Sequence, residues 1–453
     1  MTQRHVQYVC QQCGRAVPKP LGRCPQCGAW NSMVAETLKP PAAPSRRAAS
    51  LAGAVRLDAI DDEGGERVAV PIEEFARVLG GGIVPGSIVL IGGDPGIGKS
   101  TLLLQVALAL AESRAVLYVS GEESVRQIKG RADRLGKAGQ SGLHLLAETE
   151  LEGVVRQIES LQPGLAVIDS IQTMHDAEWD PAAGSITQVR QCAARLQALA
   201  KTSGVPVFLI GHVTKDGSIA GPRVLEHLVD TVLYLEGDAQ HAFRLLRAVK
   251  NRFGPTTEVG VFEMSGAGMV QVPNPSEAFL AERVVQAPGS VVSVTLEGAR
   301  PLLVEIQGLT SPTAFGNPRR TANGVDFNRL LLITAVLTRR LGLSLSDQDV
   351  FVNVVGGLQL DEPAADLGIA AALASSLRDR PIAADVAVVG EVGLSGELRA
   401  VPQLGARLRE AAKLGFRRVV APRSPRLEAA PAGLELIAAR SLREALDFLI
   451  PKA

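Results

Sequence analysis

The sequence has no apolar stretch of the roughly 18–20 residues that a membrane-spanning helix needs. Its beginning, MTQRHVQYVC, also lacks the apolar segment of a signal peptide. Neither sign of charge is in excess, because Lys plus Arg and Asp plus Glu both number 47, so the overall charge gives no sign of a polyanionic partner. We therefore expect a cytoplasmic protein that has no membrane partner.

Cysteine is also scarce, with five residues in a chain of 453. Four of them form two close pairs and Cys192 stands alone, which does not suit a disulfide framework. Hydrophobic residues make up 46% of the chain and charged residues 21%, as in globular proteins with a large core. At about 100–200 residues per domain, the length predicts roughly three domains.

The four paired cysteines are Cys10, Cys13, Cys24 and Cys27, which form two CxxC pairs near the start of the chain. This spacing, with glycine directly after each pair, is typical of a structural four-thiolate Zn²⁺ site. Redox chemistry would be an alternative for one pair, but two pairs favour zinc. We predict a C4 zinc finger over residues 1–32 that contacts DNA or protein, and then a flexible linker rich in Pro, Ala and Ser over residues 33–56.

A phosphate-binding motif follows a short apolar strand predicted at 87–91. The run GDPGIGKS matches G-x-x-x-x-G-K-[ST], and an apolar helix is predicted to begin at Thr101. In such a loop the backbone amides surround phosphate groups, and the helix N-terminus favours negative charge. Lys99 is expected to reach the β- and γ-phosphates of ATP, and the Ser100 hydroxyl to bind Mg²⁺. The predicted ATP contacts are Gly93, Asp94, Pro95, Gly96, Ile97, Gly98, Lys99, Ser100 and Thr101.

Carboxylates follow two further strands, predicted at 116–120 and 165–168. Glu122 and Glu123 follow the first and Asp169 the second, at the strand ends where open α/β sheets keep their chemistry. We expect Asp169 to order the Mg²⁺ shell, a role compatible with the alternative of a helix N-cap. Glu122 is favoured over Glu123 as the base that polarises the attacking water, but the sequence does not separate the two.

The order of these motifs resembles that of the RecA-type ATPases. The following run VPVFLIGHVTKDG is similar to the sensor strand of that superfamily, which implies that His212 senses the γ-phosphate. Further on, KNRFG at 250–254 is similar to a signature of the RadA/Sms family of bacterial DNA-repair proteins. Zinc module, phosphate loop, KNRFG and C-terminal region follow that family's order along nearly the whole chain. The resemblance implies a RecA-like ATPase domain over residues 57–275.

KNRFG contains two cations, Lys250 and Arg252, which would share one face of a strand. An exposed basic strand end is the alternative that spacing alone favours. The family resemblance implies instead that both cations reach the nucleotide of a neighbouring subunit, where they stabilise charge on the γ-phosphate. We therefore expect a homo-hexamer or a filament, since the site is complete only between subunits.

Two segments, 175–191 and 214–223, are predicted to be loops after sheet strands. In RecA-like proteins the equivalent loops hold single-stranded DNA, so Arg190, Lys215 and Arg223 become candidate phosphate contacts. Aromatic residues are few, with Trp179 alone in these loops, which favours tracking of the backbone over base stacking. Ordinary surface loops remain the alternative.

The C-terminal residues 276–453 resemble the proteolytic domain of Lon. That chemistry needs a serine nucleophile and a lysine base, but alignment puts Asp366 and Arg407 at these two positions. Arg407 cannot lose its proton near neutral pH. We expect Asp366 and Arg407 to form an ion pair in a proteolytically inactive α+β domain that holds the oligomer together.

The predicted fold class is α/β: a RecA-like P-loop ATPase core with an N-terminal four-Cys zinc ribbon and a C-terminal Lon-protease-like domain. The resemblance implies a DNA-dependent ATPase of recombinational repair that acts on single-stranded and branched DNA, together with a RecA-type strand-exchange recombinase. Its cofactors would be ATP, Mg²⁺ and Zn²⁺. Two alternatives are an ATP-driven signalling switch of the KaiC kind and, disfavoured by Asp366 and Arg407, an ATP-dependent protease.

Overall fold

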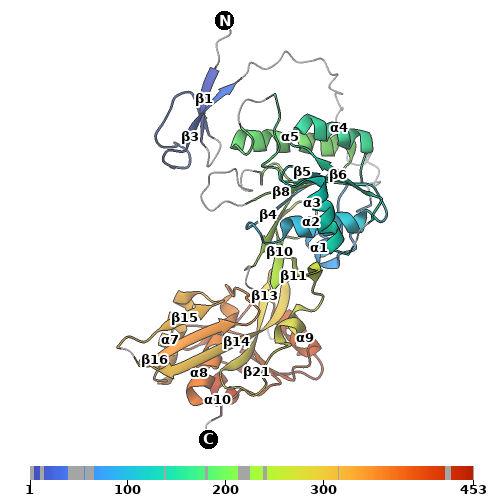
Figure 1. The fold of residues 1–453 in the computed structure, drawn as a ribbon. Coiled ribbons are helices and arrows are strands. Elements are labelled where there is room, and N and C mark those ends of the chain that lie inside the picture. Colours follow the sequence, from blue (N-terminus) through green and yellow to red (C-terminus); the bar gives the residue numbers. More distant parts are fainter. Residues whose placement is uncertain are drawn as a thin grey trace. The chain divides into compact units, whose positions relative to one another are not determined.

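The computed structural model describes residues 5–10, 15–38, 56, 66–136, 139–178, 182–212, 225–237, 242–314, 316–423 and 430–451 (Figure 1). The chain forms two compact units. The first comprises Met1–Ala239 and Arg244–Gln271, and the second comprises Gln240–Phe243 and Val272–Ala453. Within the described residues, no helix is both long and apolar enough to cross a membrane.

A small antiparallel sheet of order β2-β1-β3 lies at the N-terminus and contains β1 (His5–Cys10), β2 (Ala16–Val17) and β3 (Met33–Leu38). Strand β3 occupies the first six residues of the predicted linker. It extends the ribbon because it pairs with β1 along the full length of both strands. Of the remaining predicted linker residues, all but Arg56 lie outside the described residues.

The core of the first unit is a nine-stranded sheet of order β12-β11-β10-β9-β4-β8-β7-β5-β6. Its strands from β9 to β6 run parallel, whereas β10 is antiparallel to β9 and β11 to β12. The elements are α1 (Glu73–Leu79), β4 (Ile88–Gly93), α2 (Lys99–Leu110), β5 (Val116–Ser120), α3 (Val125–Arg134), β6 (Leu143–Ala147), α4 (Leu151–Leu161), β7 (Leu165–Asp169), α5 (Ile186–Ser203), β8 (Val207–Ile210), β9 (Thr231–Glu236), β10 (Phe243–Asn251), β11 (Val259–Ser265) and β12 (Gly268–Gln271).

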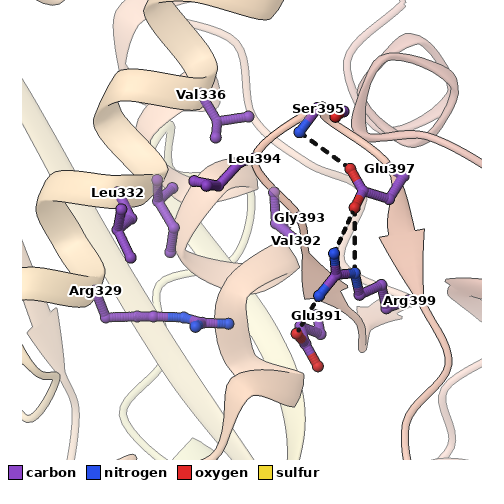
Figure 2. Close-up of a pocket in the computed structure, with 11 residues that line it drawn as sticks. Arg329, Leu332, Val336, Glu391, Val392, Gly393, Leu394, Ser395, Glu397 and Arg399 are labelled. Carbon is purple, nitrogen blue, oxygen red and sulfur yellow. Dashed lines mark hydrogen bonds and ion pairs between the residues drawn. The ribbon is translucent and has the colours of Figure 1, made fainter.

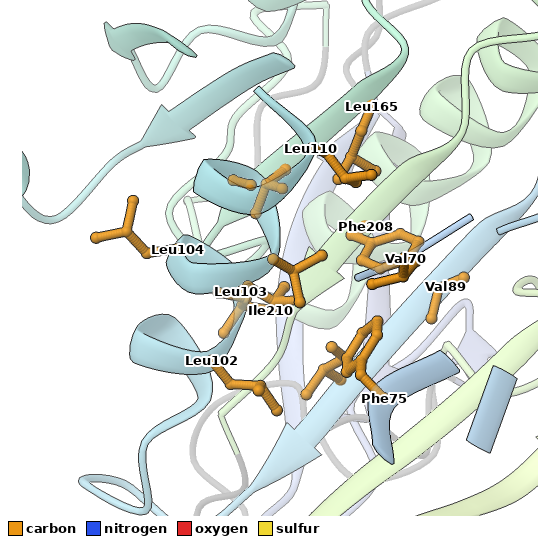
Figure 3. Packing of buried hydrophobic residues seen from close by; sticks show 14 of the residues in the cluster. Val70, Phe75, Val89, Leu102, Leu103, Leu104, Leu110, Leu165, Phe208 and Ile210 are labelled. Atoms are coloured by element: carbon orange, nitrogen blue, oxygen red, sulfur yellow. The ribbon is translucent and has the colours of Figure 1, made fainter. Parts of the chain in front are cut away.

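Alternate residues of the central strands pack on opposite faces of this sheet. Val89 of β4 belongs to the core formed with α1, α2 and α3, whereas its neighbours Ile88 and Leu90 belong to the core formed with α4 and α5. Figure 3 shows the first core, where the rings of Phe75 and Phe208 lie 6.1 Å apart. Because helices cover both faces, the parallel strands are nearly continuous apolar runs.

The second unit contains a seven-stranded sheet of order β15-β16-β14-β13-β17-β20-β21 and a separate pair, β18-β19. Helix α8 packs against β13 and β14, and α7 and α10 pack against α8. The elements are α6 (Pro275–Leu280), β13 (Ser290–Glu297), β14 (Arg300–Pro312), β15 (Arg320–Asn323), α7 (Phe327–Leu341), β16 (Gln348–Val354), η3 (Pro363–Ala365), α8 (Asp366–Arg378), β17 (Val386–Val388), β18 (Glu391–Val392), β19 (Leu398–Arg399), α9 (Leu404–Lys413), β20 (Arg418–Pro422), β21 (Glu435–Ala439) and α10 (Leu442–Leu449).

Glycine permits the close approach of α8 to its sheet. A Cβ atom added at Gly308 of β14 would lie 2.9 Å from the carbonyl carbon of Ala372 and 2.9 Å from the nitrogen of Leu373. Contacts between the two backbones leave no room for any larger residue. The N-terminal end of α8, where the sequence predicts a lost nucleophile position, is also buried, since Asp366 is 1% exposed.

Candidate ATPase and zinc sites

The phosphate loop joins the end of β4 to the beginning of α2, which starts at Lys99, two residues before the predicted Thr101. Gly93, Gly96 and Gly98 all have positive φ values, of 147°, 78° and 113°. A Cβ atom at Gly93 would lie 2.4 Å from the carbonyl oxygen of Leu235. The loop therefore requires glycine, and it presents its amides at a helix N-terminus, the arrangement that binds phosphate.

Lys99 is 3% exposed, and its Nζ donates hydrogen bonds to the carbonyl oxygens of Gly93 at 2.9 Å and Asp94 at 3.0 Å. Burial lowers the pKa of Lys99, while Asp169, Asp94 and Glu122 act in the opposite direction. Ser100 and Thr101 lie in the first turn of α2. A buried ammonium group beside a glycine loop fits the phosphates of a nucleotide, because both charges are then compensated away from water.

Asp169 ends β7 and is almost fully buried. The hydroxyl of Tyr118, on the adjacent strand β5, donates a hydrogen bond of 2.7 Å to Asp169 Oδ2. Burial and the Asp169 charge raise the pKa of Tyr118 well above its usual value, so this phenol remains a donor. The next α-helix of the described chain, α5, has Ser185 as its N-cap, and so Asp169 is not the cap that the alternative proposed.

The structure separates the two glutamates after β5. The carboxylate of Glu122 accepts a hydrogen bond of 2.7 Å from the hydroxyl of Ser170. Glu123 turns instead toward α3 and forms an ion pair of 2.8 Å with Arg131. Since Ser170 directly follows Asp169, Glu122 is the glutamate that faces the carboxyl end of β7.

His212 lies just after β8, where the amide of Gly211 donates to the carbonyl oxygen of Ile91 in β4 at 2.9 Å. Its Nε2 lies 3.4 Å from Glu122 Oε1. This nitrogen is buried and makes no hydrogen bond to the part of the chain that the structure describes. A polar nitrogen in that position is suited to a phosphate oxygen, because a buried donor needs a partner.

The KNRFG cations both contact residues of the same chain. Lys250 Nζ donates to the carbonyl oxygens of Glu226 and Val229, each at 2.7 Å. Arg252 lies just beyond the end of β10, and its Nη1 is 3.4 Å from Asp230 Oδ1. A register shift between residues 248 and 250 interrupts the pairing with β9. The two cations are therefore not side by side on a regular strand, and Lys250 is held by backbone of its own chain.

Of the candidate DNA contacts, Arg190 is exposed on α5. The second part of the predicted loop 175–191 is thus helical, since α5 begins at Ile186 behind the Ser185 cap. Lys215 and Arg223, like Trp179, lie outside the described residues.

The zinc ribbon brings Cys10, Cys24 and Cys27 together, with their sulfur atoms within 4.8 Å of one another. The sulfurs of Cys10 and Cys27 are 3.6 Å apart, close to the spacing of about 3.8 Å expected for tetrahedral Zn–S bonds of 2.3 Å. Gly28 has a positive φ of 76°, which explains the glycine after this cysteine pair. Cys13 lies outside the described residues. These residues fit the predicted zinc ion.

In the second unit, the expected ion pair between Asp366 and Arg407 is wrong. Asp366, at the beginning of α8, is paired with Arg329 of α7, whose Nε donates to Asp366 Oδ1 at 2.6 Å. Arg407, on α9, is paired with Glu362 and also donates to the carbonyl oxygen of Val294 at 2.7 Å. Asp366 and Arg407 are thus each compensated by a different residue, and they do not pair with each other.

A cavity of about 260 Å³ lies beside this region, between α7 and the β18–β19 hairpin (Figure 2). Arg329, Leu332 and Leu394 line one side, and Glu397 and Arg399 form an ion pair of 2.8 Å on the other. The lining residues include Ser395 but neither lysine nor histidine. The lysine base of Lon-type chemistry is therefore not among them, and the Glu397 carboxylate is paired with Arg399.

Fold and site together define a P-loop ATPase of the RecA-like class, joined to a zinc ribbon and a Lon-type domain. Residues 56–218 match the family described as an AAA domain, residues 8–35 the rubredoxin metal binding domain, and residues 341–448 the Lon protease (S16) C-terminal proteolytic domain. ATP and Mg²⁺ belong to the first of these domains and Zn²⁺ to the second.

Full-length relatives are more specific. The DNA repair protein RadA of Bacillus subtilis (strain 168) is 52% identical to this chain, and the alignment covers 98% of this chain and 99% of the Bacillus protein. That of Streptococcus pyogenes serotype M1 is 50% identical over 99% of both chains. A solved KaiC-like protein of Pyrococcus horikoshii OT3 aligns with 46% of this chain and 99% of its own, with 20% identity and a TM-score of 0.39. The chain belongs to the RadA family of DNA repair proteins.

Several residues of the site have no motif that would reveal them in the sequence. Tyr118 and Ser170 hold the two carboxylates by hydrogen bonds, and Arg131 draws Glu123 away from the site. The only signal for Tyr118 is a phenol within the buried strand VLYVS, since a buried hydroxyl needs a partner.

Proposed function

We propose that this protein is a DNA-stimulated ATPase that moves along single-stranded DNA as a ring and processes branched recombination intermediates. The observation that carries the ATP chemistry is the position of Glu122, which contacts Ser170 and lies 3.4 Å from His212. These three residues follow β5, β7 and β8, which are neighbours in the sheet whose strand β4 leads into the phosphate loop. The DNA substrate is inferred from the RadA relatives, whose names describe DNA repair.

The proposed roles follow from this placement. The loop amides and Lys99 bind the phosphates, while Ser100 and Asp169 hold Mg²⁺, which when bound neutralises charge on the phosphoryl oxygens. Tyr118 keeps the Asp169 carboxylate in one orientation. Glu122 orients and polarises the attacking water, and the nearby His212 Nε2 responds to the γ-phosphate. Glu123 is a neighbour whose charge is compensated by Arg131.

Hydrolysis also requires a cation on the transferred phosphoryl group, and we assign this role to the KNRFG segment of an adjacent subunit. Arg252 supports the assignment, because its side chain is 53% exposed and has one long contact with Asp230. Lys250 anchors the segment through its two carbonyl contacts and assists Arg252 in trans after rearrangement. A homo-hexameric ring, or a filament, would place each Arg252 beside the next nucleotide.

Single-stranded DNA would bind to Arg190, Lys215 and Arg223, through phosphate contacts that make binding sensitive to salt. A strand-exchange recombinase of the RecA kind is the proposed protein partner, and the cytoplasm the proposed compartment. The Lon-type domain serves as a scaffold for the oligomer. The ion pairs of Asp366 and Arg407 support a structural role, because the serine nucleophile and the lysine base of Lon-type chemistry are both missing from these positions.

The test is ATP turnover with and without single-stranded DNA. We expect DNA to raise turnover by an order of magnitude or more, whereas a KaiC-like switch would hydrolyse ATP at the same rate in both conditions. Casein incubated with the active ATPase should remain intact. Turnover unchanged by DNA would overturn the motor, and casein cleavage dependent on ATP would overturn the scaffold role of the second unit.

A further inference from the structure

Trp30 of the zinc ribbon is 71% exposed, which is unusual for the largest apolar side chain. The guanidinium group of Arg23 lies over its ring, 5.8 Å from the ring centroid. An indole left in water forgoes the stabilisation that burial of a large apolar side chain supplies. Tryptophan combines a large apolar ring with an N–H donor and is enriched at interfaces, so an indole this exposed is a candidate contact residue.

The backbone holds this stacked pair in place. Arg23 and Trp30 form an antiparallel bridge, and the amide of Asn31 donates to the carbonyl oxygen of Gly22 at 2.8 Å. Arg23 Nε also donates to the carbonyl oxygen of Gly28 at 2.9 Å. Both partners are therefore ordered before any ligand binds, which reduces the entropy lost on binding.

The segment of sequence around Trp30 carries positive charge. Residues 15–35 contain Arg15, Lys19 and Arg23 but neither aspartate nor glutamate, and all three cations are exposed. The zinc–thiolate cluster itself is negative, but two of its sulfurs belong to the buried residues Cys10 and Cys24. A ligand at Trp30 thus meets an indole stacked with the Arg23 guanidinium, in a ribbon that carries two further exposed cations.

We infer that Trp30 and Arg23 form a stacking platform for a base of single-stranded DNA, with Arg15 and Lys19 near its phosphates. Aromatic stacking combined with basic side chains is the chemistry by which proteins bind single strands without sequence preference. This inference rests on the proposed action on single-stranded DNA. It assigns the zinc ribbon to DNA, the alternative being a surface for another protein.

The chain has only two tryptophans, so Trp179→Phe leaves Trp30 as the sole indole of the zinc-loaded, full-length protein. In a first titration of this reference variant, the anisotropy of a fluorescein-labelled dT oligonucleotide measures DNA binding. In a second titration at low salt, with the unlabelled oligonucleotide, indole fluorescence reports the environment of Trp30. We expect fluorescence to be quenched over the same concentration range in which anisotropy rises, because a stacked base quenches indole.

Substitutions then measure the contribution of stacking. Trp30→Ala in the Trp179→Phe background should weaken binding of the dT oligonucleotide roughly tenfold, the range of a lost base–aromatic stack, and Trp30→Phe should retain most of the affinity. Val34→Ala is the matched control, since Val34 is an exposed apolar residue of the same ribbon. Zinc content, measured for every variant, shows that the ribbon is folded.

Anisotropy that rises without quenching of Trp30 would overturn the platform while leaving the DNA motor intact. Equal affinity of the zinc-loaded Trp30→Ala and reference proteins would do the same and would point to a protein partner. No DNA binding in either titration would overturn the proposed motor together with this inference.

Discussion

Replacement of Arg252 by alanine separates the stability of the chain from the proposed action of Arg252 on a neighbouring nucleotide. Arg252 is more than half exposed, and among the described residues its one ionic contact, at 3.4 Å, is with Asp230. Asp230 is buried, but this contact is longer than the roughly 2.7–2.9 Å of a charge-assisted hydrogen bond, so it contributes little to stability. Asp230 also keeps a second partner, the amide of Ile88 at 3.1 Å. Arg252→Ala should therefore fold normally and bind ATP.

Hydrolysis should respond very differently. An arginine supplied to a phosphoryl group from a neighbouring subunit accelerates turnover by about 10³–10⁵-fold in related chemistry. We expect Arg252→Ala to lower kcat by at least about a hundredfold, since Lys250 supplies part of the charge. Arg247→Ala is the matched control: Arg247 lies on β10, the strand that leads to Arg252, and pairs with Glu236 at 2.8 Å. Its turnover should stay within about twofold of the unsubstituted protein.

Mixing of variants tests action in trans. Lys99→Ala subunits lack a working phosphate loop but carry Arg252, and Arg252→Ala subunits have the opposite defect. In equal, random mixtures about one site in four combines an intact loop with an intact neighbouring arginine, so ATP turnover should recover toward that fraction. A mixture of Arg252→Ala with the double variant Lys99→Ala/Arg252→Ala should recover nothing. If the first mixture is no more active than its separate components, Arg252 does not act between subunits.

Three further substitutions test individual residues. Lys99→Ala removes the buried ammonium group, so binding of a fluorescent ATP analogue or turnover should be lost; normal values for both would show that the phosphate loop is misassigned. Cys27→Ser should release zinc, measured with a colorimetric chelator, while the ATPase core retains its basal turnover; one zinc ion per chain in this variant would argue against the four-thiolate site. Tyr118→Phe leaves a buried oxygen of Asp169 without its hydrogen-bond donor. Urea unfolding followed by tryptophan fluorescence should therefore show that the free energy of unfolding falls by about 1–3 kcal/mol. An unchanged unfolding curve would mean that this hydrogen bond does not stabilise the protein.

Much of the fold and site could be predicted from short segments of sequence. The strand 116–120 has the predicted bounds, and the strands at β4 and β7 differ by one or two residues, because an apolar run bounded by glycine or a carboxylate is a local signal. Two CxxC pairs and the glycine loop are likewise contiguous. Their chemistry depends on backbone conformations that neighbouring residues largely determine.

The partners of charged side chains depended on tertiary structure. Asp366 pairs with Arg329, 37 residues earlier, and Arg407 with Glu362, 45 residues earlier, whereas the sequence suggested that they pair with each other. Packing of α7 on α8 places Arg329 at the buried carboxylate, and no periodicity within either helix encodes that neighbour.

The same distinction applies to the ATPase site. The sequence by itself determined that a phosphate loop, two strand-end carboxylate positions and a cysteine cluster exist, since each is a pattern along a continuous stretch. Only the tertiary structure decided that Glu122 faces Ser170 and His212 while Glu123 faces Arg131. Adjacent carboxylates are equivalent in a sequence, but a helix packed beside one of them makes their electrostatic surroundings different.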